Sequence, residues 1–285
     1  MKRAVLIANR CGVFDELRKI RELELVHTCA VHGSPLHEAL QNLPQVPYSV
    51  LNDCRPELLM AALAEIDFDV LISNGCPAIL PVSRMRRTHQ TFVNVHPSLL
   101  PELRGQHPAN GALLRGHTSA GATMHFMDDR IDAGRVIHQE RFPLSDDLDL
   151  GLLYRLLFAT EARTFAIGMR KLLDSDFKFA GVPQDGAGSS YRRDEADMRI
   201  DLAAQSDAEL VLRIRAFGVK SQGVSCTLDQ HTFRIYEAQP VRNPALLALF
   251  TGAEPATIVY RYDGKLLVRT RDGLLRVTSF AESPS

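Results

Sequence analysis

Short apolar runs alternate with amphipathic segments through the first half of the chain. Apolar and β-branched side chains gather at residues 4–8, 25–31, 68–73 and 91–96, which predicts buried β-strands there. Helical spacing predicts helices at residues 13–23 and 55–66, with a helix or connector at 83–89. Pro56 stands near the first helical position of the second helix, where proline is tolerated. This alternation predicts an α/β fold, a Rossmann-like, mostly parallel sheet with flanking helices.

The pattern changes in the second half of the chain. Two β-like runs, at 124–127 and 135–142, precede a long amphipathic helix at 149–173. Glycine and proline then become frequent, so we place a linker at residues 181–190, between a catalytic domain of residues 1–180 and a domain of residues 191–285. The second domain is expected to be smaller and mainly β, a barrel or an open sheet. Its predicted elements are a helix at 208–216 and strands at 224–228, 232–237, 256–262, 265–269 and 273–278.

Composition narrows the classes of function. With 24% charged residues and a net charge of −1, the composition does not indicate a polyanion-binding surface over the whole chain. Its longest apolar runs are far below the ~18 residues of a membrane span. Five cysteines, an odd number without Cys-x-x-Cys spacing, are typical of a reducing cytoplasm. Neither a metal site nor NAD binding is expected, because metal-ligand histidine spacing and the Gly-x-Gly-x-x-Gly motif are both missing from the sequence.

Candidate chemistry gathers at the end of the fourth predicted strand. The run there is Asn94-Val95-His96-Pro97-Ser98-Leu99-Leu100-Pro101. Residues i and i+2 of a strand point to the same face, so Asn94 and His96 should enter one cleft. Pro97 would then end the strand. Further along, the run from Gly121 to Gly134 carries Asp132. In spacing and flanking residues, the two runs together resemble the folate-dependent formyltransferases, which move a formyl group from 10-formyltetrahydrofolate to an amine.

The resemblance implies that Asn94, His96 and Asp132 are the catalytic residues. When an amine attacks a formyl carbonyl, a tetrahedral centre forms with negative charge on its oxygen. An asparagine amide is a neutral, fixed donor to that oxygen, and a histidine can donate or accept a proton near pH 7. A carboxylate beside the histidine fixes its tautomer and stabilises the protonated ring. Taken alone, each of these residues would instead be read as a loop or turn residue.

The resemblance also implies where the formyl donor binds. In the family, the pterin head packs beside the residues that follow the strand before the asparagine strand. Here that segment is apolar with two prolines, which suits a fixed loop that offers main-chain groups and an apolar wall. The implied folate contacts are Cys76, Pro77, Ala78, Ile79 and Leu80, together with Asp128 from the second run.

The acceptor is expected to be an amino-deoxysugar linked to a nucleotide. After the catalytic turn come Arg104, Gly105, Gln106, His107 and Pro108, which look most like the enzymes that formylate such sugars. Gln106 and His107 would approach the acceptor amine. Arg10, which follows the first strand, would meet an anionic group such as the diphosphate. A possible homodimer stays open.

Other acceptors were weighed. The region from Tyr191 to Glu237 resembles the second domain of methionyl-tRNA formyltransferase as much as that of an aminosugar formyltransferase. However, residues 191–285 carry 13 Lys and Arg against 12 Asp and Glu, a net charge of +1, which is poor for tRNA and makes a nucleic-acid partner unlikely on the sequence. A hydroxyornithine formyltransferase is a smaller alternative. A non-catalytic folate-binding module is disfavoured because all three expected catalytic residues are present.

Overall fold

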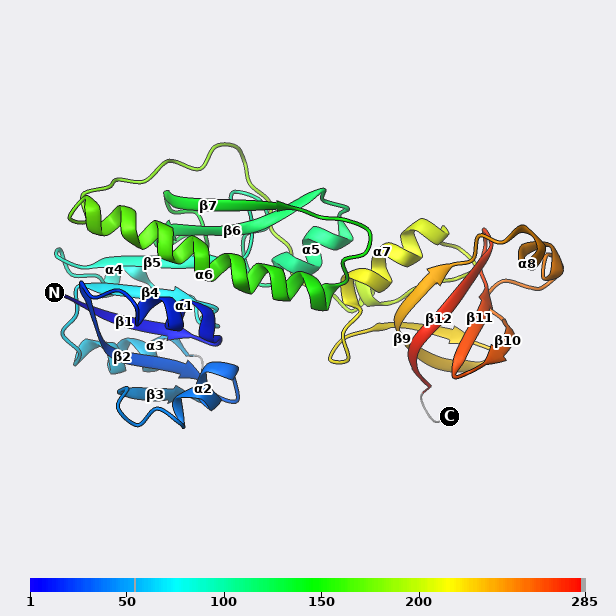
Figure 1. Ribbon diagram of the computed structural model, residues 1–285, viewed down its shortest axis with the longest axis horizontal. Coiled ribbons are helices and arrows are strands. Elements are labelled where there is room, and N and C mark those ends of the chain that lie inside the picture. Colours follow the sequence, from blue (N-terminus) through cyan, green and yellow to red (C-terminus); the bar gives the residue numbers. More distant parts are fainter. Residues whose placement is uncertain (54, 283–285) are drawn as a thin grey trace. The chain divides into compact units, whose positions relative to one another are not determined.

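The computed structural model describes residues 1–53 and 55–282, and its chain forms two compact units (Figure 1). The first unit contains Met1–Gly105, Ala120–Phe142 and Arg155–Tyr191. The second contains Gln106–Ser119, Pro143–Tyr154 and the chain from Arg192 onward. The second unit therefore includes two stretches from within residues 1–180, the span expected to form the catalytic domain.

The first unit is built on a seven-stranded sheet with the strand order β3-β2-β1-β4-β5-β6-β7. The strands from β3 to β5 in this order pair in parallel, whereas β6 runs antiparallel to β5. The mostly parallel α/β sheet expected from the sequence is confirmed. The strands are β1 (Lys2–Ala8), β2 (Leu23–Val31), β3 (Tyr48–Leu51), β4 (Val70–Asn74), β5 (Thr91–His96), β6 (Ser119–Phe126) and β7 (Val136–Pro143).

Helices cover both faces of this sheet (Figure 1). Strand β1 is apolar throughout because its alternate side chains enter two different cores. Ala4, Leu6 and Ala8 pack in the core with residues of α1, α2 and α6, whereas Val5 and Ile7 pack with residues of α3 and α4. These helices are α1 (Cys11–Leu17), α2 (Pro35–Leu40), α3 (Pro56–Ala64), α4 (Val82–Met85) and α6 (Leu150–Asp174).

Several short elements differ from the sequence expectation. The helix expected to reach residue 23 ends at Leu17, because Leu23 already pairs with Lys2 at the start of β2. Among the elements that we did not predict are α2, β3 and α5 (Pro108–Leu114). Each is seven residues or shorter, so it offers little periodicity to recognise.

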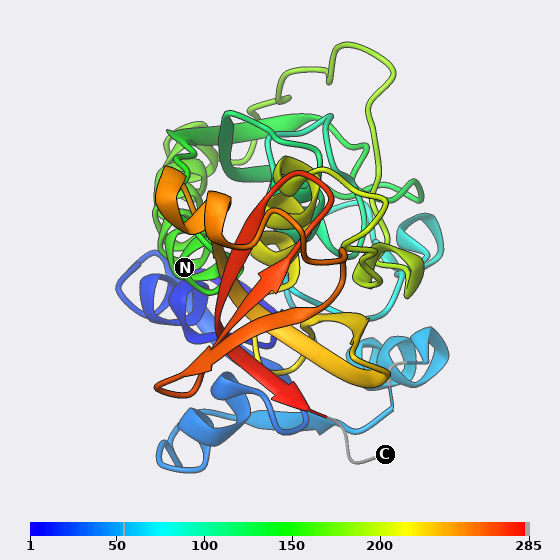
Figure 2. The ribbon, with the colours of Figure 1, turned by 90° about the vertical axis from the view of Figure 1, so that its right-hand side faces the viewer.

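The second unit is a five-stranded antiparallel sheet with the order β10-β11-β12-β9-β8 (Figure 2). It confirms the mainly β second domain. The 3-10 helix η1 (Ala196–Met198) and α7 (Asp207–Phe217) precede the sheet in the sequence. Ser206 and Glu209 form a capping box at the N-terminus of α7. The remaining elements are β8 (Val224–Leu228), β9 (His231–Pro240), α8 (Pro244–Leu249), β10 (Ile258–Tyr262), β11 (Lys265–Arg269) and β12 (Leu274–Glu282).

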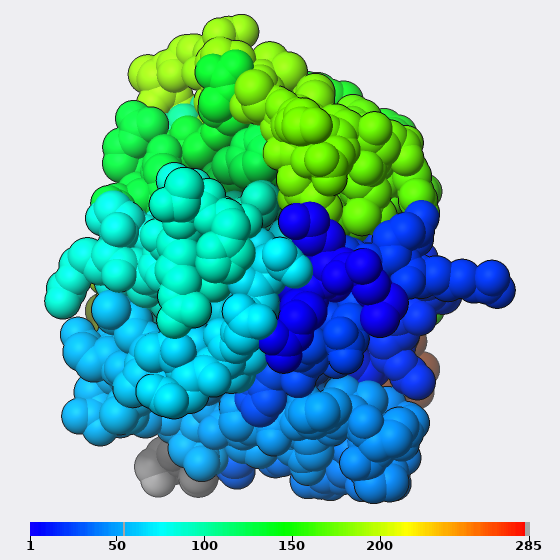
Figure 3. All heavy atoms as spheres, turned by 90° about the vertical axis from the view of Figure 1, so that its left-hand side faces the viewer, coloured from blue at the N-terminus to red at the C-terminus, as the bar shows by residue number. Residues whose placement is uncertain are grey.

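The start of the chain is held between two later segments of the first unit. In Figure 3 the dark blue N-terminal residues lie between cyan residues and the yellow-green end of α6. Lys2 Nζ lies 3.5 Å from Asp69 and 5.8 Å from the centre of the Phe177 ring, and Arg3 pairs with Asp67. These contacts hold the N-terminal end of β1 beside the residues that lead into β4.

Three features expected from composition can be compared with the structure. No helix within residues 1–53 and 55–282 has the length and hydropathy needed to cross a membrane. Over the same residues, no three His, Cys, Asp or Glu side chains are grouped as metal ligands would be. Cys11, Cys29, Cys76 and Cys226 form no disulfide within the described part of the chain, and Cys54 lies outside it.

Candidate active site

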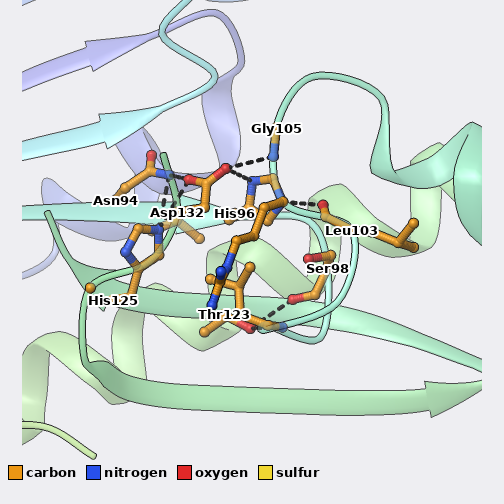
Figure 4. Close-up of polar contacts among 12 residues, drawn as sticks. Asn94, His96, Ser98, Leu103, Gly105, Thr123, His125 and Asp132 are labelled. Carbon is orange, nitrogen blue, oxygen red and sulfur yellow. Dashed lines mark hydrogen bonds and ion pairs between the residues drawn. The ribbon is translucent and has the colours of Figure 1, made fainter. Parts of the chain in front are cut away.

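The carboxylate of Asp132 is the centre of the candidate site (Figure 4). Its Oδ1 accepts a hydrogen bond of 3.1 Å from Asn94 Nδ2 and lies 3.3 Å from His125 Nε2. Its Oδ2 accepts a 2.9 Å hydrogen bond from the main-chain N–H of Gly105 and lies 3.4 Å from His96 Nδ1. The structure therefore brings the three predicted catalytic residues together and adds His125 and Gly105 to them.

The pairing of β5 with β6 places four of these side chains. Asn94 stands opposite His125, and His96 stands opposite Thr123. Because side chains two apart on a strand share a face, all four point to the same side of the sheet. Asp132 comes from the loop between β6 and β7, where its backbone has a φ of 50°. Aspartate tolerates this left-handed conformation better than most residues, which suits it to this turn.

The turn after β5 is organised by Thr123. Its hydroxyl donates to the carbonyl of Ser98 at 2.6 Å and accepts from the N–H of Leu100 at 3.2 Å. The chain then reaches Leu103, which has a φ of 56° and whose carbonyl oxygen lies 2.9 Å from His96 Nε2. The Ser-Leu-Leu-Pro turn thus returns the main chain to the histidine.

The surroundings of Asp132 keep its carboxyl group ionised. Burial alone would raise the pKa of Asp132, since the side chain is only 11% exposed. The charge of His96 and the hydrogen bonds from His125 and Gly105 outweigh that effect and hold the pKa of Asp132 well below its usual range. Asp132 is therefore a permanent anion at neutral pH.

The ring of His96 is held between two acceptors. Nε2 faces the carbonyl oxygen of Leu103, and Nδ1 faces the carboxylate of Asp132. A neutral imidazole has one N–H, so it can satisfy only one of these contacts, whereas the imidazolium donates to both. The arrangement therefore suits a doubly protonated His96 that is buried and fixed in orientation.

Asn94 uses its amide nitrogen inside the cluster. Nδ2 donates one hydrogen to Asp132, and it lies 3.2 Å from His125 Nε2, which can accept the second hydrogen only when Nε2 carries no proton. Donation to a formyl oxygen, the role expected from the resemblance, would require one of these contacts to be exchanged. That donor role stays a prediction.

His125 and Gly105 were not singled out by the sequence analysis. His125 is 2% exposed, and its Nδ1 lies 2.8 Å from the carbonyl of Phe126, which leaves Nε2 directed at Asn94 and Asp132. The predicted strand at 124–127 contains His125, but its pairing with the strand at 91–96 was not predicted, so nothing in the sequence placed it opposite Asn94. Gly105 acts through its main-chain N–H, which no side-chain pattern reveals.

The two segments expected to bind folate pack against each other. Met127, Cys76, Ala78 and Leu80 belong to the same apolar cluster. Asp129 Oδ1 also accepts a 2.9 Å hydrogen bond from the N–H of Ser83, which ties the loop of Asp132 to α4.

This packing leaves Pro77 exposed and Ile79 60% exposed. Asp128 accepts from the N–H of Arg130 at 2.8 Å and pairs with its side chain. Folate contacts at these residues stay a prediction.

Arg10 is paired with a buried carboxylate. Its Nε and Nη2 donate to the two oxygens of Glu161 at 2.7 and 2.5 Å, and its Nη1 donates to Asn9. Burial raises the pKa of Glu161, and the neighbouring Arg10 opposes that rise. Asn74 donates to the same carboxylate at 3.0 Å. The expected contact of Arg10 with an acceptor diphosphate stays a prediction, with two guanidinium N–H groups left for it.

Gln106 and His107 open the first stretch of the second unit. The side chain of Gln106 is exposed. His107 Nδ1 accepts a 3.2 Å hydrogen bond from the main-chain N–H of Arg193. Burial, together with the positive charges of Arg193 and Arg192, lowers the pKa of His107 and keeps its ring neutral at pH 7. Their predicted approach to the acceptor amine stays a prediction.

Comparison with known families matches both units. Residues 32–166 match the formyl transferase family model, and residues 193–283 match the model of the formyl transferase C-terminal domain. The methionyl-tRNA formyltransferase of Acidiphilium cryptum is 29% identical over 249 residues, which is 87% of this chain and 77% of that protein. The methionyl-tRNA formyltransferase of Geobacillus thermodenitrificans is 30% identical over 71% of this chain, which spans 61% of that relative's length.

A solved structure shares the fold over nearly the whole chain. It is the N-formyltransferase of Helicobacter canadensis, crystallised with folinic acid and dTDP-3-aminofucose. The TM-score is 0.71 at 16% sequence identity, and the match covers 99% of this chain and 100% of that one. At this identity the likeness establishes the common fold.

Proposed function

Since the chain belongs to the folate-dependent formyltransferase family, we propose that it moves a formyl group from 10-formyltetrahydrofolate to the amine of a nucleotide-linked amino-deoxysugar. The observation that supports this catalytic site most is the Asp132 carboxylate, which gathers Asn94, His96, His125 and the N–H of Gly105 around one buried charge.

In the proposed reaction the acceptor amine attacks the formyl carbon, and negative charge develops on the formyl oxygen. The acceptor nitrogen then gives up a proton, the bond from the formyl carbon to tetrahydrofolate breaks, and the nitrogen of the leaving tetrahydrofolate takes up a proton. His96 is the group suited to stabilise the negative oxygen, with its Nε2–H exchanging the carbonyl of Leu103 for the formyl oxygen. Asp132 holds that ring in place through its contact with Nδ1.

The donor site proposed for 10-formyltetrahydrofolate rests on the loops that flank Asp132. This co-substrate supplies the formyl group when it is bound. Ile79 and Ile131 are 60% and 50% exposed, an uncommon placement for large apolar residues, and they lie on two segments that pack against each other. They suit the face of an aromatic pterin ring, and the loops also offer main-chain groups to its polar edge.

The charge of the second domain supports a small acceptor. Residues 191–285 carry a net charge of +1, whereas tRNA binding calls for a surface that neutralises many phosphates. Several arginines of residues 191–285 donate to main-chain carbonyl oxygens within the second unit, so their side chains are partly engaged inside the protein. They are Arg213, Arg215, Arg234, Arg269 and Arg271.

Methionyl-tRNA is the second candidate acceptor, and a specific observation favours it. The relatives from Acidiphilium cryptum and Geobacillus thermodenitrificans are both methionyl-tRNA formyltransferases, and they are more similar in sequence than the Helicobacter canadensis enzyme. Identity near 30% preserves a formyltransferase fold and its chemistry. The choice of acceptor depends on a few contacts outside the catalytic cluster. We therefore give the charge of the second domain more weight than this sequence similarity when we propose the acceptor.

A panel of acceptors tests the proposal. The purified protein is incubated with 10-formyltetrahydrofolate and with dTDP-, UDP- or GDP-linked aminosugars, with methionyl-tRNA and with hydroxyornithine. We expect formylation of at least one nucleotide aminosugar with the highest kcat/KM of the panel. A higher kcat/KM for methionyl-tRNA would replace the acceptor and retain the catalytic assignment. Transfer to none of them would reject the proposed function.

A further inference from the structure

We propose that Gln184 is a positioning residue of the active site, which joins the loop of Asp132 to the loop that follows the catalytic turn. The residue lies in the segment that the sequence analysis took for a linker. This inference deepens the proposed formyl transfer and rests on it for the turnover measurements described below.

The amide of Gln184 contacts both loops at once. Its Nε2 donates to the main-chain carbonyls of Asp132 and Gly134, at 2.8 and 2.7 Å. Its Oε1 accepts from Arg104 Nη2 at 2.7 Å and from Arg104 Nε at 3.2 Å. Every amide hydrogen and the amide oxygen are thus engaged, and the side chain is half-buried.

The segment around Gln184 is anchored at both ends. Val182 exchanges two main-chain hydrogen bonds with Val136 at the start of β7. At the other end Ser189 accepts from the N–H of Leu103 through its hydroxyl at 2.9 Å, and its main-chain N–H donates to the carbonyl of Pro101. The segment that carries Gln184 is therefore fixed to β7 at one end and to the turn after β5 at the other.

The two loops joined by Gln184 need such support because each contains a residue in an unfavourable backbone conformation. Asp132 has a φ of 50° and Leu103 a φ of 56°, a range that costs a non-glycine residue free energy unless its surroundings hold it. These same residues make the contacts that hold His96, one through its carboxylate and the other through its carbonyl. A small shift of either loop would move the histidine.

Only an amide meets both demands at this position. A carboxylate of the same size would still accept from Arg104, but it would present oxygen to the carbonyl oxygens of Asp132 and Gly134. In its protonated form a carboxyl group regains one O–H donor. The substitution Gln184→Glu should therefore be more harmful at neutral pH than at acidic pH, a dependence that a purely space-filling role would not produce.

The first test compares three variants of the full chain. Turnover is measured against pH with 10-formyltetrahydrofolate and the best acceptor of the panel. We expect Gln184→Ala and Gln184→Glu to lower kcat by about tenfold or more at neutral pH, with KM for the folate changed less than threefold. The ratio of Gln184→Glu to wild-type kcat should rise as the pH falls, and that of Gln184→Ala should stay flat. The neighbouring exposed residue provides the control, Asp185→Asn, which should match wild type.

The second test needs no acceptor. The N–H of Gly105 donates to Asp132 Oδ2, so its hydrogen exchange reports whether the two loops stay together. We expect its protection to fall about tenfold or more in Gln184→Ala and to stay unchanged in Asp185→Asn. Unchanged protection together with wild-type kcat in Gln184→Ala would overturn the proposal. If the panel yields no acceptor, the proposed function fails and the exchange measurement alone decides the role of Gln184.

Discussion

Asn94 and His125 stand directly opposite each other on β5 and β6, and both contact the same carboxylate oxygen of Asp132. Their side chains are also 3.2 Å apart, so each limits the position of the other. The cross-strand pair means that the candidate catalytic cluster is built across two strands and a loop, so a change at one member should alter the positions of the others.

His96 and Asn94 should be essential for turnover. We expect His96→Ala and Asn94→Ala each to lower kcat by ~10²–10³, about 3–4 kcal/mol of barrier, because each removes a side chain of the cluster that we propose acts on the formyl carbonyl. Both variants should give folded protein by circular dichroism. A purified variant that turns over near the wild-type rate would exclude its residue from the mechanism.

Asp132→Asn should separate binding from rate. An amide keeps the size of the side chain but removes the charge that stabilises the protonated His96, so folate binding should stay close to normal while kcat falls. The low pKa of Asp132 means that the wild-type carboxylate stays ionised across the assay range, and its contribution to folding is lost only as the pH falls through that lowered value. The pH–rate profile of the variant should therefore shift on its alkaline limb, where activity is lost with the proton, and an unchanged profile and rate would contradict this role.

His125 should matter through Asn94 and Asp132. We expect His125→Ala to lower kcat by about tenfold, less than His96→Ala, because the side chain orients the cluster and does not itself face the acceptor. The exposed His89 offers a matched control, and His89→Ala should leave kcat unchanged. Equal rates for the two variants would show that the cross-strand contact is dispensable.

The pair of Arg10 and Glu161 should be structural. Glu161 is 1% exposed, so Glu161→Gln leaves the guanidinium of Arg10 without its charge partner and should lower the free energy of unfolding by about 3–5 kcal/mol. Glu22 pairs with Arg170 on the surface, and Glu22→Gln should hardly change stability. Chemical denaturation of both variants measures the difference. Equal stability of the two would mean that the buried pair contributes nothing.

The sequence was most informative where one physical rule decides the outcome. The strand expected at 91–96 is the strand observed, and its alternation predicted that Asn94 and His96 share a face. The pattern of residues could not place Asp132 beside Asn94 and His96, because that placement depends on how β6 pairs with β5. Only the family resemblance indicated that the three residues belong together. Gly105 and Gln184 act on or through main-chain groups, and their glycine- and proline-rich surroundings indicated only turns and a linker.

The acceptor is decided most directly by competition in one reaction. Wild-type protein receives 10-formyltetrahydrofolate labelled at the formyl carbon, with equal concentrations of the best nucleotide aminosugar and of methionyl-tRNA, at low and at moderate salt. The distribution of label gives the ratio of the two kcat/KM values. We predict label chiefly on the sugar nucleotide at both salt concentrations. Label chiefly on methionyl-tRNA, declining steeply as salt rises, would contradict the proposed function.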